Sequence, residues 1–301
     1  EISACLVGSE MCIRDRMENQ GFDISATAKV LALKDFSWEI SAGLGHYKNK
    51  VTALPDGDKP VYTSLYGGEV VTQVGGPVGL FYGYKTQGVF STSEDAASAG
   101  LRNGRADGDV FRGGDMHFAD LVADGVIDEK DKTVIGDPNP DIFGNFGTSL
   151  HYKNWTLNAF FSYSLGNDIY NYQRAVLEGG STYYNQTTAV LNRWTSEGQV
   201  TEIPRAELGD PMGNSRFSDR WIEDGSYLKL KTLSLSYRIP FNYTFLQGIT
   251  VWAAANNVFT CTKYLGSDPE LSISSSAVGQ GIDRGLLGRG RSFVLGVKIN
   301  L

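Results

Sequence analysis

Residues 143–165 read FGNFGTSLHYKNWTLNAFFSYSL, and this stretch decides the fold. From residue 155 onward, apolar and polar side chains alternate. One face carries Trp155, Leu157, Ala159, Phe161, Tyr163 and Leu165, and the other carries Thr156, Asn158, Ser162 and Ser164, with Phe160 as the exception. A period of two predicts a β-strand with one apolar face. With the turn at Lys153-Asn154, the stretch predicts a hairpin of strands of about ten residues, the length that crosses a bilayer when tilted.

The same pattern recurs on both sides of this hairpin. An N-terminal hairpin is predicted from Phe22 through the turn at Lys34-Asp35 to Leu44, with Phe22, Ile24, Ala26, Ala28 and Val30 on one face of its first strand. A third pair is predicted over 227–239 and 249–258, and a last strand over 292–301. Leu228 and Leu230 are out of phase with Leu233 and Leu235, which predicts a β-bulge near Lys231.

The connections between these strands differ strongly in length. Those after Leu33 and Tyr152 are very short, whereas those after Leu44, Leu165 and Val258 run for tens of residues. Short turns at one end and long loops at the other are typical of an outer-membrane barrel. A stretch at 188–197 is interpreted as a helical turn inside such a loop.

The alternative that these patterns leave open is a soluble β-sandwich. Sandwich strands are usually shorter, with a most common length of about 5–6 residues. Aromatic residues also stand at the ends of the predicted strands (Phe22, Phe36, Tyr152 and Trp155), which suits the girdles of a membrane barrel. The pattern therefore favours an all-β, antiparallel transmembrane β-barrel with long extracellular loops.

Composition excludes several other classes of protein. The 301 residues include 36 Gly, 15 Tyr and 15 Phe, which favours many strands joined by turns. A net charge of -7 argues against nucleic acid as a partner. No apolar run reaches the length of about 18 residues that predicts a transmembrane helix. Cys5, Cys12 and Cys261 indicate neither a disulfide framework nor a zinc cluster.

Residues 1–16 differ from the rest of the chain. They have no signal-peptide pattern, and CLVGSEMCIRDR reads like a translated sequencing adapter. We therefore expect residues 1–16 to be a non-native segment and residues 17–301 to be part of a longer barrel.

Residues 120–131, DLVADGVIDEKD, resemble a calcium-binding loop. Such loops place oxygen ligands at positions 1, 3, 5, 9 and 12, glycine at 6 and a backbone carbonyl at 7. The ligands expected on this spacing are Asp120, Asp124, Val126, Asp128 and Asp131, with Gly125 at the turn. Position 3 is Val122, which has no side-chain oxygen, so a metal-free Asp-Gly turn remains the alternative. Calcium is the one cofactor that the sequence suggests, and none is required.

No catalytic motif stands out. His46, His117 and His151 do not form a zinc-binding pattern, and neither a nucleophile elbow nor a phosphate-binding loop is present. Residues 285–290, GLLGRG, do not follow the dinucleotide-binding order. We therefore expect a protein that is not an enzyme.

Several longer segments carry a family resemblance. They include FYGYKTQGVF (81–90), KTVIGDPNPDIFGNFGTSLHYKNWTLNAFFSYSLGNDIYN (132–171), GDPMGNSRFSDRWIEDGSYLKLKTLSLSY (209–237) and SFVLGVKINL (292–301). From about Glu18 onward, the chain resembles the SusC/RagA family of TonB-dependent outer-membrane receptors. Two departures stand out: Val122-Ala123 replaces the Asn-Gly usual in the family's acidic loop, and Leu301 stands where an aromatic terminal residue is common.

The resemblance implies more than the patterns alone. It implies the C-terminal part of a 22-stranded barrel, without the N-terminal plug domain, in the outer membrane. It implies a SusD-like surface lipoprotein and the TonB complex as partners, the latter acting through the absent N-terminal part, and import of an oligosaccharide or peptide. Loops 166–226 and 259–291 would contact partner and substrate, although the substrate-binding residues stay unknown.

Two further questions stay open from sequence. The first is whether Tyr183, Tyr184, Trp194 and Trp221 stack on sugar rings or pack the loops together; packing is the favoured interpretation. The second is the function class. A passive outer-membrane porin or a soluble, calcium-stabilised β-rich adhesin are the alternatives to a nutrient receptor.

Overall fold

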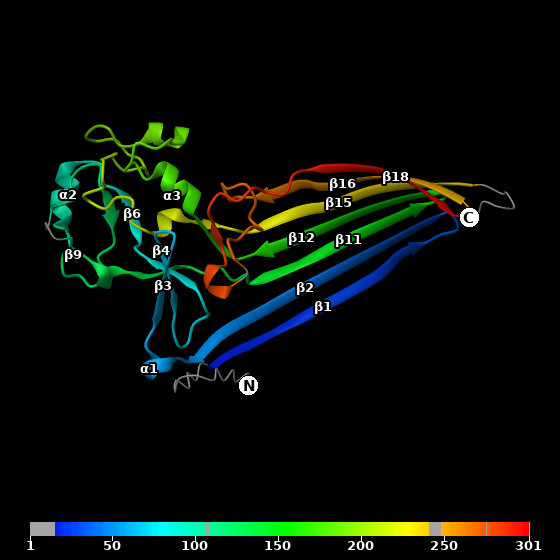
Figure 1. Cartoon of the computed structure of the whole chain (residues 1–301), viewed down its shortest axis with the longest axis horizontal. Coiled ribbons are helices and arrows are strands. Elements are labelled where there is room, and N and C mark those ends of the chain that lie inside the picture. The colour runs from blue at the N-terminus through cyan, green and yellow to red at the C-terminus, as the bar shows by residue number, and fades with distance from the viewer. Residues whose placement is uncertain (1–15, 106–108, 241–247, 275, 301) are drawn as a thin grey trace, which may run out of the picture.

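The seven long strands form one antiparallel sheet a single layer thick (Figure 1). The computed structural model describes residues 16–105, 109–240, 248–274 and 276–300. The strands, in their order across the sheet, are β1 (Arg16–Ala32), β2 (Phe36–Ala53), β11 (Ile142–Tyr152), β12 (Trp155–Leu165), β15 (Tyr227–Ile239), β16 (Gly248–Thr262) and β18 (Ser292–Asn300). Every strand predicted from alternation is confirmed, except that Leu301, the last residue of the predicted strand 292–301, lies outside the described residues. β1 and β2 are longer than expected, because the segments 17–21 and 47–51, which lack apolar alternation, pair with each other.

The register aligns the apolar residues of all these strands into rows on one face. At the end with the short turns, the row is Phe36, Tyr152, Trp155, Tyr237, Val251 and Val297. The next row is Leu31, Trp38, Leu150, Leu157, Leu235, Ala253 and Leu295. No second layer covers this face: Leu235 in the middle of the sheet is 43% exposed, and Leu295 at its edge is 83% exposed. The packing expected of a sandwich is therefore absent from the described sheet.

The opposite face is mostly small and polar. One row consists of Ser41, Gly147, Phe160, Thr232, Asn256 and Ser292, and the next of Gly43, Asn145, Ser162, Lys229 and Thr260. Phe160 stays the exception that the sequence already marked. A sheet with one exposed apolar face and one polar face is what the wall of a membrane barrel requires.

Register shifts occur at several points of the sheet, and two of them bear on the predicted faces. The register shifts between Leu230 and Thr232, which confirms the bulge predicted near Lys231. A second shift lies between Lys29 and Leu31, so that Leu31 rather than Val30 lies opposite Trp38. The prediction that Val30 shares the apolar row was therefore wrong, because the extra residue moves the strand's phase by one.

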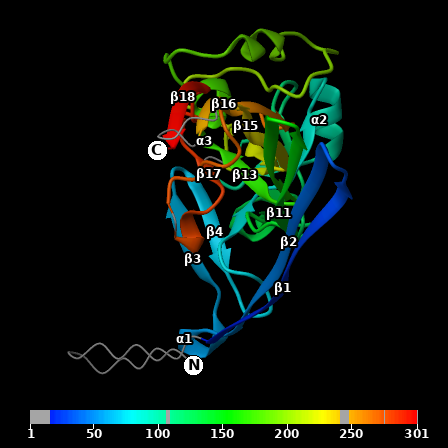
Figure 2. The same cartoon turned by 90° about the vertical axis from the view of Figure 1, so that its right-hand side faces the viewer.

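At the other end of the sheet, the connections 54–141, 166–226 and 263–291 fold into a common structure, which we call the loop body (Figures 1 and 2). Its strands are β3 (Val61–Leu65), β4 (Gly68–Thr72), β5 (Leu80–Gly83), β6 (Thr86–Val89), β7 (Arg102–Asn103), β8 (Met116–Phe118), β9 (Val126–Ile127), β10 (Thr133–Gly136), β13 (Asp168–Asn171), β14 (Ile222–Asp224) and β17 (Ile282–Asp283). Its helices are α1 (Pro55–Asp58), α2 (Ser93–Ala99) and α3 (Tyr172–Glu178), with 3-10 turns at Glu129–Asp131, Thr188–Asn192, Asp219–Trp221 and Ala277–Gly279. The turn at 188–192 confirms the helical turn expected within 188–197.

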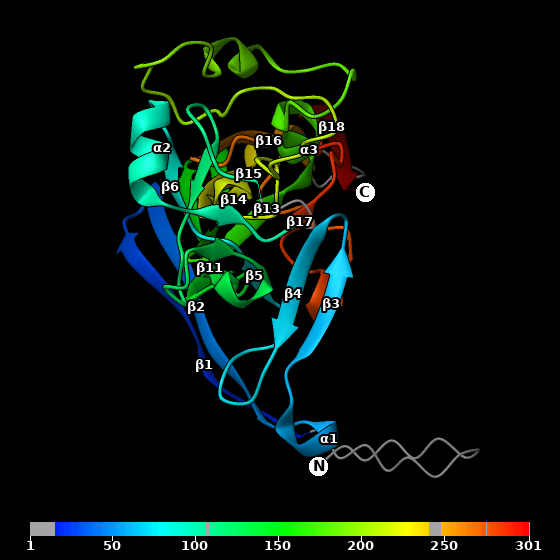
Figure 3. The same ribbon diagram turned by 90° about the vertical axis from the view of Figure 1, so that its left-hand side faces the viewer.

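Figure 3 views the molecule from the side of the loop body. Two hydrophobic cores hold this body together. The first core gathers Tyr84, Phe90, Ala96, Leu101, Phe111, Met116, Phe118, Ile127 and Met212. The second gathers Val70, Phe81, Tyr170, Trp221 and Ile282. β13 and β17 pair in parallel through Tyr170 and Ile282, which joins the second long connection to the third. The connections are therefore folded against one another rather than extended independently.

Among the described residues, no helix is both long enough and apolar enough to span a membrane. Of the segment 1–16, residues 1–15, with Cys5 and Cys12, lie outside the described residues, and Arg16 begins β1. The expectation that residues 1–16 are non-native stays a prediction.

Candidate functional site

The acidic loop lies on the loop body, between β8 and β10. Asp131 is fully buried and accepts hydrogen bonds from the backbone N–H groups of Leu121, Val122 and Asp128. Its carboxylate thus closes the two ends of the loop on each other. β9, inside this loop, pairs in parallel with β7, which holds the turn against the first core.

Three more carboxylates of this loop also accept hydrogen bonds from backbone N–H groups. Asp120 accepts from the N–H groups of Gly125 and Ala123, and the bond from Gly125 contributes most to lowering the pKa of its carboxyl. Asp124 accepts from the N–H of Val126, and Asp128 accepts from that of Lys130. In the described part of the chain, no group of three or more acidic, His or Cys side chains converges in a way that could hold a metal ion. The loop folds on its own hydrogen bonds, and calcium binding stays a prediction.

The four aromatic residues singled out from sequence divide into two pairs. Trp221 is buried in the second core, and Trp194 donates its indole N–H to the carbonyl of Ser91, so packing is confirmed for both. Tyr183 and Tyr184 instead project from the loop body, with 89% and 73% of their surfaces exposed. The packing interpretation was wrong for these two, because their segment folds back over the loop body without covering them.

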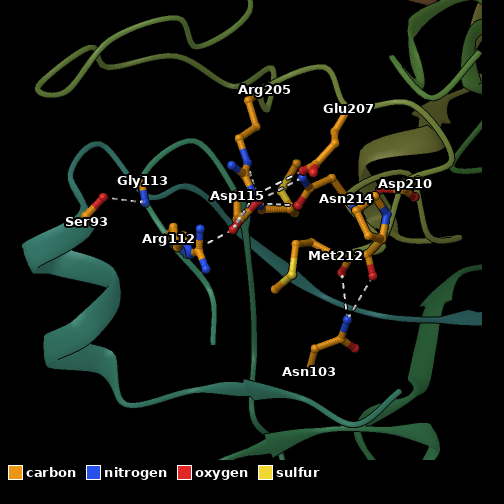
Figure 4. Close-up of polar contacts among 12 residues, drawn as sticks. Ser93, Asn103, Arg112, Gly113, Asp115, Arg205, Glu207, Asp210, Met212 and Asn214 are labelled. Atoms are coloured by element: carbon orange, nitrogen blue, oxygen red, sulfur yellow. Dashed lines mark hydrogen bonds and ion pairs between the residues drawn. The ribbon is translucent and has the colours of Figure 1, made fainter. Parts of the chain in front are cut away.

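A partly buried ion pair fastens the segment that carries these tyrosines (Figure 4). The carboxylate of Asp115 is fully buried and accepts hydrogen bonds from Arg205 Nε at 2.8 Å, Asn214 Nδ2 at 3.0 Å and the backbone N–H of Arg112 at 2.8 Å. Ninety residues separate Asp115 from Arg205. We call the group of Asp115, Arg205 and Asn214 the latch, because it fixes residues 181–214 to the first long connection.

A second ionic cluster lies on the polar face of the sheet. Lys229 of β15 is buried and contacts Asp268 at 2.8 Å and Glu270 at 2.7 Å, both from the connection between β16 and β18. Tyr227 and Lys231 also donate to Glu270. Segment 263–273 is thereby folded inward over the polar face, and the apolar face stays free.

A cavity of about 400 Å³ opens between the two cores of the loop body. The tip of the β3–β4 hairpin, the end of β5, the residues that follow β7 and β9, and Lys132 with Arg216-Phe217 form its walls. Its charged lining residues are Glu69, Arg105, Asp128, Glu129, Lys132 and Arg216, and its aromatic ones are Tyr82, Tyr84 and Phe217. Burial, followed by the hydrogen bond with Tyr62, raises the pKa of Tyr82 to about 12, so this phenol stays protonated at neutral pH.

The histidines form no catalytic group. His117 stacks on Phe90 with ring centroids 4.2 Å apart, and burial lowers the pKa of its imidazole. His46 contacts the carbonyl of Asp141, and His151 contacts Thr156. Each ring therefore has a local structural partner. The residues of the cavity and of the latch escaped the sequence analysis, because none forms a motif and their partners lie far away in the chain.

Known proteins match nearly the whole chain. A TonB-dependent receptor of Formosa agariphila, P3, is 32% identical over 97% of this chain, which covers 30% of that protein. The TonB-dependent receptor SusC of Bacteroides thetaiotaomicron is 26% identical over 94% of the chain, which covers 26% of it. The chain thus spans less than a third of the curated relatives it matches. No family model matches.

Solved structures agree on the fold. The RagAB peptide transporter superimposes with a TM-score of 0.74 and 24% identity over 96% of this chain. The RagAB peptide importer in its closed-closed state superimposes with a TM-score of 0.73 and 22% identity, again over 96%. In both cases the chain covers 30% of the solved chain.

Proposed function

We infer that the chain is part of a TonB-dependent outer-membrane receptor of the SusC/RagA type, and we propose that this receptor imports a nutrient. The observation that carries the proposal is the single-layer sheet, whose aligned apolar rows stay exposed while its polar face receives a folded loop. In water, each exposed large apolar side chain lacks the stabilisation of about 1.5–3 kcal/mol that full burial would give. A lipid bilayer removes that penalty along the whole face.

The wall continues beyond the described sheet in this proposal. β1 and β18 are the edge strands, and in the described part of the chain each pairs with one neighbour only. Exposed sheet edges are not tolerated in a membrane, because their N–H and C=O groups find no water there. Further strands of the same receptor would pair with both edges and close the barrel, which in this family has 22 strands.

The partners and the substrate class follow from the family. A SusD-like surface lipoprotein would cover the loop body, and the TonB complex would supply energy from the inner membrane. The cargo would be an oligosaccharide or a peptide. The solved RagAB structures are described as those of a peptide importer, which supports the transport of solutes of that size.

The other two function classes are less well supported. An adhesin in aqueous solution would have to cover the apolar rows, of which Phe293 and Leu295 are more than four-fifths exposed. A passive porin needs an open lumen, whereas segment 263–273 is fastened over the polar face by buried charges.

The proposal has a direct test in cells that carry the complete receptor. Separation of the inner and outer membranes should place the receptor in the outer membrane, extractable only by detergent. Growth on the imported nutrient should depend on both the receptor and the TonB complex. Growth that persists without TonB would favour the porin, and release from membranes by alkaline carbonate would favour the adhesin.

We also propose a weak calcium site in the loop 120–131. Asp120, Asp124, Asp128 and Asp131 supply carboxylates, and Val126 supplies a carbonyl, at the spacing of calcium loops. A bound cation would stiffen a loop that already folds through its own hydrogen bonds. Because position 3 lacks an oxygen ligand, weak affinity is expected.

A further inference from the structure

The cavity between the two cores of the loop body is lined by two arginines, Arg105 and Arg216, that form no ion pair with any residue the structure describes. Arg216 packs against Tyr84 and Phe118: its guanidinium carbon lies 5.3 Å from each ring centroid, and the centroids of the two rings are 5.5 Å apart. Its Nη2 donates to Asn103 Oδ1 and to the carbonyl of Met212. Its Nη1 is buried and has no hydrogen-bond partner among the described residues.

Arg105 lies beside this group. Its Nη1 donates to the carbonyl of Asp210, which stands two residues before the carbonyl that Arg216 binds. The positive charge of Arg105 is among the causes that lower the pKa of the Arg216 guanidinium, after burial itself. Two guanidinium groups therefore line the same cavity. In the described part of the chain, the acceptors of their hydrogen bonds are all neutral oxygens.

The nearby carboxylates are already engaged. Asp210 accepts from the N–H groups of Asn214 and Ser215 and from the Ser215 hydroxyl. Glu69 and Glu129 both contact Lys132. Asp128 contacts Lys130 outside the cavity. No ion pair among the described residues includes Arg105 or Arg216.

A buried charge without a counterion is costly, and the protein tolerates it where a partner completes the site. We propose that this cavity is a subsite for a carboxylate group on a small polar solute, held by Arg105 and Arg216. This inference rests on the proposed function, since it assigns the subsite to a receptor for nutrients. Arginine presents a planar fork of donors that matches the two oxygens of a carboxylate.

Size and charge both favour a carboxylate over a larger or more highly charged anion. A volume of about 400 Å³ suits one or two sugar or amino-acid units. The wall has three carboxylates, those of Glu69, Asp128 and Glu129, and three cations, so it offers no excess of positive charge to a divalent phosphate or sulfate. Tyr82, Tyr84 and Phe217 offer apolar surface to the rest of such a solute.

The test uses the complete receptor, purified in detergent without TonB, and two matched pairs of probes. Calorimetric titration compares galacturonate with galactose, and N-acetylglycine with N-acetylglycinamide, so that each acid has a neutral counterpart. Each acid should bind at least tenfold more tightly than its counterpart at low salt, and the preference should shrink as salt rises. The pair with the tighter acid tells whether the carboxylate belongs to a sugar or to a peptide.

Three variants decide which residues are responsible. Arg216→Met removes the charge and keeps an apolar side chain against the two rings, and Arg105→Gln removes the charge of an exposed residue. Both should abolish the preference for the acid. Arg289→Gln removes an exposed positive charge outside the cavity and should leave the preference unchanged. If Arg216→Met alters the protease digestion pattern, the loop body of that variant is misfolded. The test of the subsite then depends on Arg105→Gln alone.

Two results would overturn the subsite. One is equal binding of acids and neutral counterparts by the unchanged receptor. The other is an acid preference that survives in Arg105→Gln. Neither result bears on import, because binding is measured without TonB. Conversely, acid binding in a receptor that supports no TonB-dependent growth would refute the proposed import and leave the subsite standing.

Discussion

Trp155 and Tyr237 lie side by side on the apolar face of the sheet, with ring centroids 4.6 Å apart, at the end where the turns are short. Phe36 and Tyr152 extend the same row. Ten residues along β12, about 34 Å at ~3.4 Å per residue, Leu165 marks the other end of the apolar face. Tilted strands shorten this height towards that of the outward apolar band of membrane barrels, about 25 Å. The aromatic row therefore marks a lipid–water boundary.

A charge placed midway between these ends should destabilise the barrel according to the face it occupies. Leu233 points to the apolar face and Ser234 to the polar face of the same strand. Leu233→Arg should cost about 2–4 kcal/mol near the bilayer midplane, and Ser234→Arg should cost much less. The free energy of unfolding of each variant can be measured by denaturant titration in lipid vesicles. The folded fraction is read from the difference in gel mobility between unheated and heated samples. Equal costs would contradict the assignment of the faces.

Removing the latch should release the segment that carries Tyr183 and Tyr184. Asp115→Ala leaves Arg205 and Asn214 without their shared acceptor in a buried position. The folded loop body should lose at most about 3 kcal/mol of stability, the lower end of the ~3–5 kcal/mol typical of a broken buried ion pair, because Arg205 is partly exposed. Hydrogen exchange of residues 181–214 should accelerate. Glu207→Gln, which changes a more exposed neighbour, is the matched control and should leave that exchange slow.

The inward fold of segment 263–273 should depend on pH. Burial opposes ionisation of Glu270, but hydrogen bonds from Lys229 and Lys231 outweigh it and hold the pKa of this carboxyl below its usual value. A depressed pKa means that the stabilisation is complete above the unfolded pKa of about 4.3 and is lost as pH falls through the lower folded pKa. Hydrogen exchange of the segment should therefore rise in that acidic range. In Glu270→Gln, exchange should be faster already at pH 7, and this pH dependence should be absent.

The calcium loop can be tested by restoring the missing ligand. Val122→Asp supplies an oxygen at position 3, so Ca²⁺ affinity should rise about tenfold from a weak starting value, of the order of 10⁻⁴–10⁻³ M. Titration with Ca²⁺ and with luminescent Tb³⁺ measures the change. Asp128→Asn on the same background should reduce it again. If Val122→Asp binds no more tightly than the unchanged loop, residues 120–131 are a metal-free turn.

The long strands were predictable because their apolar and polar alternation can be read from neighbouring residues in the sequence. Alternation over 155–165 and the phase change around Lys231 each follow from neighbouring residues, and the bilayer imposes the same rule on every strand. The phase shift at Val30 escaped detection, since Lys29, Val30 and Leu31 fit either phase until the partner Trp38 is known.

The loop body was not predictable from such patterns. Asp115 meets Arg205 across ninety residues, and Arg216 meets Asn103 across an even longer stretch. No periodicity links such partners, and short helices such as α2 and α3 bury few residues of their own. The exposed positions of Tyr183 and Tyr184 depend on how their segment is fastened, which is a property of tertiary contacts.

The two cores of the loop body have a consequence for how such a chain can diversify. Membrane thickness and hydrocarbon chemistry constrain every outward residue of the wall, whereas the connections draw their cohesion from residues such as Phe118 and Trp221. Residues on the surface of the loop body can thus change without altering the apolar and polar faces of the sheet that supports them.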